Sequence, residues 1–171
     1  NSGRSTIVED GIAELVAQMV AGGRLRATTS VAEAVHATDI SLVCVGTPSA
    51  ANGALDLSYV ERVCVEIGAA IRDKSTFHTV VIRSTVLPGT VHGVATPALE
   101  RGSGKKAGVD FGVCSNPEFL REGTAVYDYY HPPKTVIGES DTRAGDMLVE
   151  LYKQMDAPMI RILEDAYHFG F

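Results

Sequence analysis

The stretch Ile40-Ser-Leu-Val-Cys-Val-Gly-Thr-Pro48 carries the clearest indication of the fold. Its first six residues are almost all apolar, and they do not alternate with polar ones. Such a run is typical of a strand buried on both faces of a parallel sheet. Gly46 lets another group approach the backbone closely, and Pro48 prevents the strand from continuing. We therefore expect a buried parallel strand over 40–45 that ends in a tight loop.

Further strands and helices alternate on both sides of this stretch. Apolar residues at helical spacing predict helices over 12–20, 57–71, 91–99 and 144–155. Pro97 predicts a kink or an early end in the third helix, and Ser30 with Glu33 predicts a capped short helix after the first. Strand-like runs fall at 25–28, 79–82, 109–114, 135–137 and 159–162. This alternation predicts an α/β domain with a Rossmann-like, doubly wound parallel sheet.

The composition limits the class of partner. A length of 171 residues suits one domain, and the net charge of -6 makes nucleic acid a poor electrostatic partner, whereas local amides can still hold a nucleotide. No apolar run approaches the ~20 residues that span a bilayer, and no signal peptide is visible. We therefore expect no membrane association and a cytoplasmic protein. The three cysteines form no CxxC pair and the five histidines lack metal-ligand spacing, so no metal site is expected.

Two strand ends carry hydroxyl residues where ligands bind in open α/β sheets, beyond the carboxyl ends of the strands. Thr47 and Pro48 end the first strand, although Gly-Thr-Pro after a strand is more often an ordinary turn. Ser84 and Thr85 end the strand over 79–82, within Arg83-Ser-Thr-Val-Leu-Pro-Gly-Thr90. These hydroxyls can face a ligand at a helix N-terminus or simply cap that helix. Spacing does not separate the two interpretations.

The third strand end, Asn116-Pro-Glu-Phe-Leu-Arg-Glu-Gly123, places two carboxylates beside apolar side chains. If the segment is helical, Glu118 and Glu122 share one face, and a carboxylate there can serve as a general base. The alternative is an ordinary solvated helix start, where acidic residues are favoured. The residues between the two acids complete a mixture of polar and apolar groups that is typical of the lip of a pocket.

One motif of dinucleotide-binding folds is missing from the sequence. No Gly-x-Gly-x-x-Gly follows a strand, and Gly102-Ser-Gly104 lies in a polar loop with the wrong context. Either the protein binds no dinucleotide, or a first βαβ unit of about 30 residues lies upstream. We therefore expect a Rossmann-type domain that lacks its first βαβ unit.

Taken together, three motifs resemble those of the UDP-glucose/GDP-mannose dehydrogenase family. They are Cys44-Val-Gly-Thr-Pro48, Arg83-Ser-Thr-Val-Leu-Pro-Gly-Thr90 and Asn116-Pro-Glu-Phe-Leu-Arg-Glu-Gly123. They come in the family's order and spacing, and the combination is far more specific than any one motif. The resemblance runs from the start of the chain to about Arg161. Leu87 and Ser103-Gly-Lys-Lys-Ala-Gly108 resemble the GDP-mannose branch of the family.

The resemblance implies an enzyme that oxidises the C6 alcohol of a sugar nucleotide to a carboxylate with two NAD molecules, through a cysteine thiohemiacetal and thioester. NAD is then the cofactor, GDP-mannose the expected substrate, and alginate-like exopolysaccharide precursor synthesis the expected role. It implies that Thr47 and Pro48 contact NAD, and that Thr85 lies near the nicotinamide and assists catalysis. Glu122 is implied as the acid–base residue. The sugar site is implied to consist of Glu118, Phe119, Leu120, Arg121 and Glu122.

The sequence also departs from the family. The family's Gly-rich loop and acidic ribose-binding residue are absent, its catalytic Cys, Lys and Asn lie downstream, and residues 162–171 no longer resemble it. We therefore expect residues 1–171 to be an incomplete NAD-binding domain without the central helical and C-terminal substrate domains, inactive in isolation. The full-length protein is expected to be a homo-oligomer.

Two other interpretations stay open at this point. One is a fragment of a UDP-glucose or UDP-N-acetyl-sugar 6-dehydrogenase, and the other is a non-catalytic remnant that binds a nucleotide. A hydroxyacid dehydrogenase of similar architecture is disfavoured by the string over 116–123.

Overall fold

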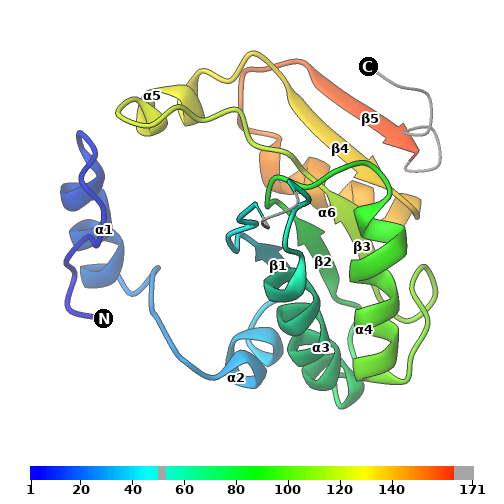
Figure 1. Ribbon diagram of the computed structural model, residues 1–171. Helices are drawn as coiled ribbons and strands as arrows, with labels where there is room; N and C mark the ends of the chain where they lie inside the picture. Colours follow the sequence, from blue (N-terminus) through cyan, green and yellow to red (C-terminus); the bar gives the residue numbers. More distant parts are fainter. Residues whose placement is uncertain (50–52, 164–171) are drawn as a thin grey trace.

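A computed structural model describes residues 1–49 and 53–163 and contains, within these ranges, a five-stranded sheet flanked by helices (Figure 1). The neighbouring strands, in order, are β1 (Ile40–Val43), β2 (Thr79–Ile82), β3 (Gly112–Ser115), β4 (Thr135–Glu139) and β5 (Met159–Leu163). The strands β1, β2 and β3 pair in parallel, as their apolar runs predict. The α/β fold class expected from the sequence is confirmed.

The direction of β4 differs from the wholly parallel sheet that the sequence predicts. β3 and β4 pair antiparallel, and β5 then runs parallel to β4, so the last two strands oppose the first three. The cause is the connection between the two strands. The chain leaves β3, passes through the loop 116–124 and the short helix α5 (Ala125–Tyr130), and enters β4 at the end of the sheet where β3 finished. An apolar run indicates burial and contains no information about strand direction.

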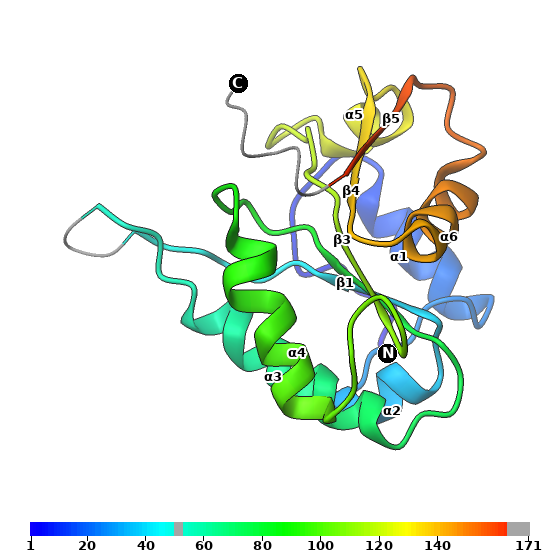
Figure 2. The same ribbon diagram turned by 90° about the vertical axis from the view of Figure 1, so that its right-hand side faces the viewer.

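Helices cover the two faces of the sheet in separate layers (Figure 2). The helices α3 (Ser58–Arg72) and α4 (Thr96–Ser103) lie on one face, and α6 (Thr142–Tyr152) lies on the other. Val80 of β2 belongs to the core beneath α3 and α4, whereas Val81 belongs to the core beneath α6, because successive strand side chains point to opposite faces. The doubly wound arrangement predicted from the sequence is therefore present.

Two glycines allow α3 and α4 to pack closely. A Cβ atom on Gly68 would lie 2.5 Å from Leu99 O, and one on Gly102 would lie 2.5 Å from Val65 O. Both neighbours are backbone oxygens, which cannot move aside without shifting a helix. The same layer buries Cys64 and raises the pKa of its thiol to about 12, so this cysteine is an unreactive core residue.

Most of the predicted helices form with small shifts of their ends. Ser30 Oγ accepts the N–H of Glu33 at the start of α2 (Val31–His36), which is the capping bond that the sequence predicts. Near Pro97 the chain forms a π-helical segment, η1 (Val91–Ala95), that continues into α4, because proline lacks the N–H of a regular helical turn. None of the helices in the described ranges is long and apolar enough to cross a bilayer.

The residues before β2 differ most from the expectations. The run over 25–28 forms no strand. The helix α1 (Ile12–Ala21) forms as predicted, but it buries none of its residues and stands apart from the sheet in Figure 1. In the described part of the chain β1 is an edge strand that pairs with β2, and its Leu42 is 43% exposed. The expectation that this strand is buried on both faces is therefore wrong for the described chain.

Candidate functional site

The loops that follow β1 and β2 are joined at the carboxyl edge of the sheet. The N–H groups of Arg83 and Ser84 both donate to Val43 O at 3.0 Å, and Thr47 Oγ1 donates to Thr85 O at 2.8 Å. The structure therefore brings together Thr47 and Thr85, two of the residues predicted to contact the cofactor. The helical segment η1 begins without a side-chain cap, so neither hydroxyl residue of this strand end caps it.

A cavity of about 190 Å³ lies beside the strand end of β2. Thr85 and Glu118 both line its wall, so it connects the second and third of the predicted strand-end loops. The rest of the lining comes from residues 82–84, 86–89, 91, 92, 115 and 117. Complete ligand pockets commonly measure about 300–1,000 Å³. The cavity is therefore large enough for part of a ligand, such as one ring, and too small for a whole dinucleotide.

A polar network that includes Arg83, a residue of the cavity wall, connects these two loops. Arg83 Nη1 donates to Asn116 Oδ1 and, at 3.1 Å, to Tyr152 Oη. Tyr152 Oη donates to the same Asn116 oxygen at 2.8 Å, and Asn116 Nδ2 donates to Val136 O at 2.8 Å. Asn116 is 1% exposed, and burial raises the pKa of Tyr152 above its usual value. The network fixes the first residue of each motif relative to the other.

The loop 116–124 contains no helix, so Glu118 and Glu122 do not share a helix face as the sequence suggested. Glu118 Oε2 instead accepts the N–H of Leu120 at 2.5 Å. A second cavity of about 30 Å³ is lined in part by Glu118, Phe119 and Leu120, while Glu122 is exposed and lines neither cavity. The predicted sugar-site residues are therefore divided between the cavity walls and the outer surface.

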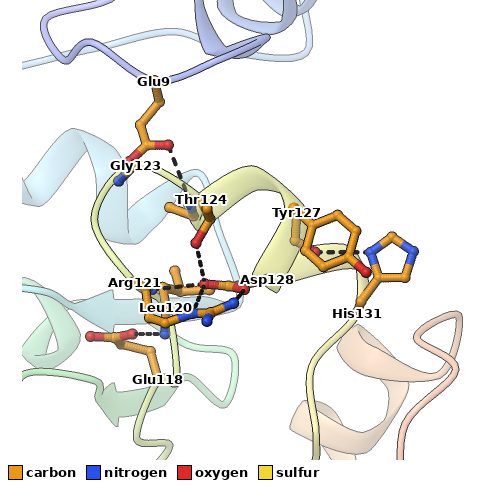
Figure 3. Close-up of polar contacts among 10 residues, drawn as sticks. Glu9, Glu118, Leu120, Arg121, Gly123, Thr124, Tyr127, Asp128 and His131 are labelled. Atoms are coloured by element: carbon orange, nitrogen blue, oxygen red, sulfur yellow. Dashed lines mark hydrogen bonds and ion pairs between the residues drawn. The ribbon is translucent and has the colours of Figure 1, made fainter.

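Asp128 holds the outer half of this loop (Figure 3). The backbone N–H and Nε of Arg121 donate to Asp128 Oδ2 at 2.9 and 3.1 Å, and Arg121 Nη2 donates to Oδ1 at 2.7 Å. Thr124 Oγ1 also donates to Asp128 Oδ2, at 2.9 Å. The Arg121 side chain contributes most to holding the pKa of this 6% exposed carboxyl well below its usual range. Arg121, predicted to line the sugar site, is thus paired with a carboxylate of its own chain.

Glu9 reaches the same loop from the N-terminal segment. Its Oε1 accepts the N–H of Gly123 at 2.6 Å, and its Oε2 accepts the N–H of Ala125 at 3.2 Å. The sequence analysis identified neither Glu9 nor Asp128. The acidic residue within the short helix after the third motif was a detectable signal for Asp128, whereas no local pattern connects Glu9 with a loop 114 residues away.

Comparison with known families shows which family this chain belongs to. The model of the UDP-glucose/GDP-mannose dehydrogenase family, NAD binding domain, matches residues 1–156. The chain belongs to this family. The resemblance drawn from the three motifs is confirmed, and so is NAD as the cofactor of the matched domain.

GDP-mannose and UDP-glucose dehydrogenases are similar to this chain over nearly its whole length. GDP-mannose 6-dehydrogenase of Azotobacter vinelandii is 61% identical over 161 residues, which make up 94% of this chain and 37% of that protein. The crystal structure of a ternary complex of GDP-mannose dehydrogenase from Pseudomonas aeruginosa is 58% identical with a TM-score of 0.94, over 96% of this chain and 38% of that one. A UDP-glucose dehydrogenase from Pyrobaculum islandicum is 43% identical with a TM-score of 0.89, over 95% of this chain and 37% of that one.

The share of each relative that is matched limits what the likeness establishes. The chain spans little more than a third of the length of these relatives. The fold and the NAD-binding class of the domain follow from the match. The roles of Thr47, Pro48, Thr85 and the loop 118–122 stay predictions.

Proposed function

We propose that this chain is the nicotinamide- and sugar-facing part of an NAD-dependent 6-dehydrogenase that oxidises GDP-mannose to GDP-mannuronate for an alginate-like exopolysaccharide. The observation that carries the proposal is the cavity that Thr85 and Glu118 line together, where the second and third family motifs meet. The higher identity to GDP-mannose than to UDP-glucose dehydrogenases favours GDP-mannose as the substrate.

The described residues fit the nicotinamide end of NAD, which accepts a hydride when bound. The size of the cavity suits one ring, and Thr85 contributes to its wall. Thr47 donates to the carbonyl of Thr85 and so fixes its backbone, and Pro48 follows Thr47 in the same loop. The sequence contains no Gly-x-Gly-x-x-Gly, so these 171 residues do not supply the Gly-rich loop that usually binds the pyrophosphate of NAD.

The sugar site in this proposal is the loop from Glu118 to Glu122. Its cavity-lining side chains would contact the sugar, and Glu122 would move the proton during thioester hydrolysis. The exposure of Glu122 is compatible with this role if a further part of the protein closes over it. The pKa of the exposed Cys44 thiol is raised, mainly by desolvation, while Arg83 lowers it and Glu118 raises it further, so this thiol is not activated as a nucleophile.

The proposal includes the organisation of the whole protein. Residues 1–171 would form an incomplete NAD-binding domain. A first βαβ unit upstream would supply the Gly-rich loop that binds the NAD pyrophosphate, and the central helical and C-terminal substrate domains would supply the nucleophilic cysteine. An exposed edge strand such as β1 favours association of the 171-residue chain. For the full-length protein we propose a homo-oligomer, which rests on the resemblance to the family. The odd number of cysteines without a CxxC pair supports the cytoplasm as its compartment.

The proposal is tested by assaying NADH formation by the full-length protein with GDP-mannose, UDP-glucose and a UDP-N-acetyl sugar in turn. We expect NADH with GDP-mannose, in a ratio of two NADH per sugar. Turnover of UDP-glucose without turnover of GDP-mannose would overturn the choice of substrate. The 171-residue chain is assayed in parallel and is expected to form no NADH, because it lacks the family's nucleophilic cysteine motif.

A further inference from the structure

The loop that carries Glu122 is held from two directions by two carboxylates. From the α5 side, Asp128 accepts the N–H of Arg121, the residue before Glu122. From the N-terminal segment, Glu9 accepts the N–H of Gly123, the residue after it, and that of Ala125. Figure 3 shows Glu9 and Asp128 on opposite sides of the loop, each directed toward its backbone. The backbone of Glu122 is therefore fixed at both neighbouring amides.

The Glu9 contact occupies a position where the loop has few other supports. Gly123 has φ of 85°, a left-handed conformation that favours glycine. The helix α5 receives no side-chain cap from Thr124, whose hydroxyl donates to Asp128. Glu9 thus satisfies the first free amide of α5, that of Ala125, from a distant part of the chain. Hydrogen bonds to a carboxylate are stronger than bonds between neutral groups, so the Glu9 carboxylate restricts the backbone of the loop at the amides of Gly123 and Ala125.

We propose that Glu9 is a positioning residue for the sugar-binding loop: its carboxylate fixes the turn at Gly123 and thereby orients Glu122. The inference rests on the proposed function, because it assumes that the loop over 118–122 contacts a sugar nucleotide. It extends that function to the N-terminal segment, to which none of the three family motifs assigns a role. Glu9 acts through the backbone of the loop and does not itself touch the substrate.

A merely structural interpretation is that Glu9 anchors the segment around α1 to the rest of the molecule. Both interpretations use the same two hydrogen bonds, but they differ in what changes when the bonds are lost. Loss of an anchor frees residues 1–25 and leaves the loop in place. Loss of a positioning residue changes the loop amides and the chemistry that depends on Glu122.

The first experiment measures backbone amide protons of the 171-residue chain by NMR in the variants Glu9→Gln and Glu9→Ala. Glu14→Gln is the matched control, because Glu14 is an exposed glutamate in the first turn of α1. We expect the amide signals of Gly123 and Ala125 to move upfield and their hydrogen exchange to accelerate roughly tenfold in Glu9→Ala. Glu9→Gln should recover part of both effects, because its amide oxygen still accepts a bond. Unchanged loop amides in Glu9→Ala would overturn the proposal.

The second experiment measures the kinetics of the same variants in the full-length protein. We expect Glu9→Ala to lower kcat for GDP-mannose oxidation about tenfold, with the KM for NAD unchanged and Glu9→Gln in between. Shifted amides with wild-type kcat and wild-type KM for the sugar nucleotide would overturn positioning and leave only an anchor. If the unmodified protein oxidises no sugar nucleotide, the proposed function fails, while the amide signals still decide whether Glu9 holds the loop.

Discussion

The helices α1 and α3 have similar apolar stripes in the sequence, yet they lie in different surroundings. α3 buries six residues, among them Cys64, Ile67 and Ile71, against α4 and the sheet. α1 buries none, and its stripe of Leu15, Val16 and Met19 is only half-buried. An apolar stripe indicates that a helix needs a partner, and it does not indicate where in the chain that partner lies. For α3 the partner follows directly in the sequence, whereas the described residues leave α1 without a covering layer.

The largest expected difference between the two helices is the cost of removing a core side chain. Ile71 is 1% exposed in the layer beneath α3, so Ile71→Ala should lower the free energy of unfolding by about 2–5 kcal/mol. Urea denaturation followed by circular dichroism measures this loss. Glu66→Ala, at an exposed position of the same helix, is the control and should change stability by less than about 0.5 kcal/mol. A loss below about 1 kcal/mol for Ile71→Ala would contradict a cooperative core on this face.

The α3 side of the molecule also contains a buried titratable group, His78. Its Nδ1 lies 3.2 Å from Lys74 Nζ and 3.1 Å from Thr38 O, and its Nε2 lies 2.8 Å from Ser41 Oγ. Burial lowers the pKa of His78 from 6.5 to about 4, and the charge of Lys74 adds to this effect. The Thr38 carbonyl and Asp39 act in the opposite direction without reversing it.

A pH dependence of stability follows from His78. The unfolded chain takes up the proton near pH 6.5 and the folded chain only near 4, so the stabilisation is complete above 6.5 and is lost as the pH falls toward 4. The loss amounts to roughly 3 kcal/mol. Urea denaturation at neutral pH and near pH 4 measures it. In His78→Gln this part of the pH dependence should disappear, whereas His131→Gln, at an exposed position, should keep it.

A smaller and more local effect is expected at Asp128. Asp128→Asn keeps the size of the side chain but removes the charge that pairs with Arg121. We expect faster hydrogen exchange at the Arg121 amide and a mobile loop over 118–124, while the exchange of β2 amides stays as in the wild type. Asp156→Asn, at an exposed carboxylate outside this network, is the control. Equal acceleration across β2 would mean that the loop and the sheet open together.

The elements that the sequence predicted are those whose burial follows from local apolar spacing. β2, with four buried residues, and α6 form where the spacing of apolar residues predicts them. The direction of β4 could not be predicted, because it depends on the connection through α5. That helix is only six residues long and carries three tyrosines, so it has no apolar stripe to detect. The prediction of a strand over 25–28 was wrong, because residues with strand propensity form a strand only where a neighbouring strand can pair with them.

The candidate site was predictable to the extent that parallel strands end at one edge. That rule correctly placed Thr47 beside Thr85, and it brought Glu118 to the cavity that Thr85 lines. The rule could not predict the shape of the third loop, since the backbone of Arg121 is held by a carboxylate seven residues later and not by helical bonds. The contact from Glu9 depends on tertiary structure across most of the chain, so no motif within the loop could reveal it.

The smallest expected effect sharpens the contrast between α1 and α3. Leu15 is half-buried on the stripe of α1, so Leu15→Ala should lower the free energy of unfolding of the 171-residue chain by less than about 1 kcal/mol. Gln18→Ala, at an exposed position of α1, is the control, and both are measured by urea denaturation. A loss of about 2 kcal/mol or more would mean that α1 packs against the body of the chain in solution. The proposed longer protein makes a further prediction: the same substitution should cost more there than in the 171-residue chain if an added layer covers the stripe of α1, because a covered leucine loses more contacts when it is shortened.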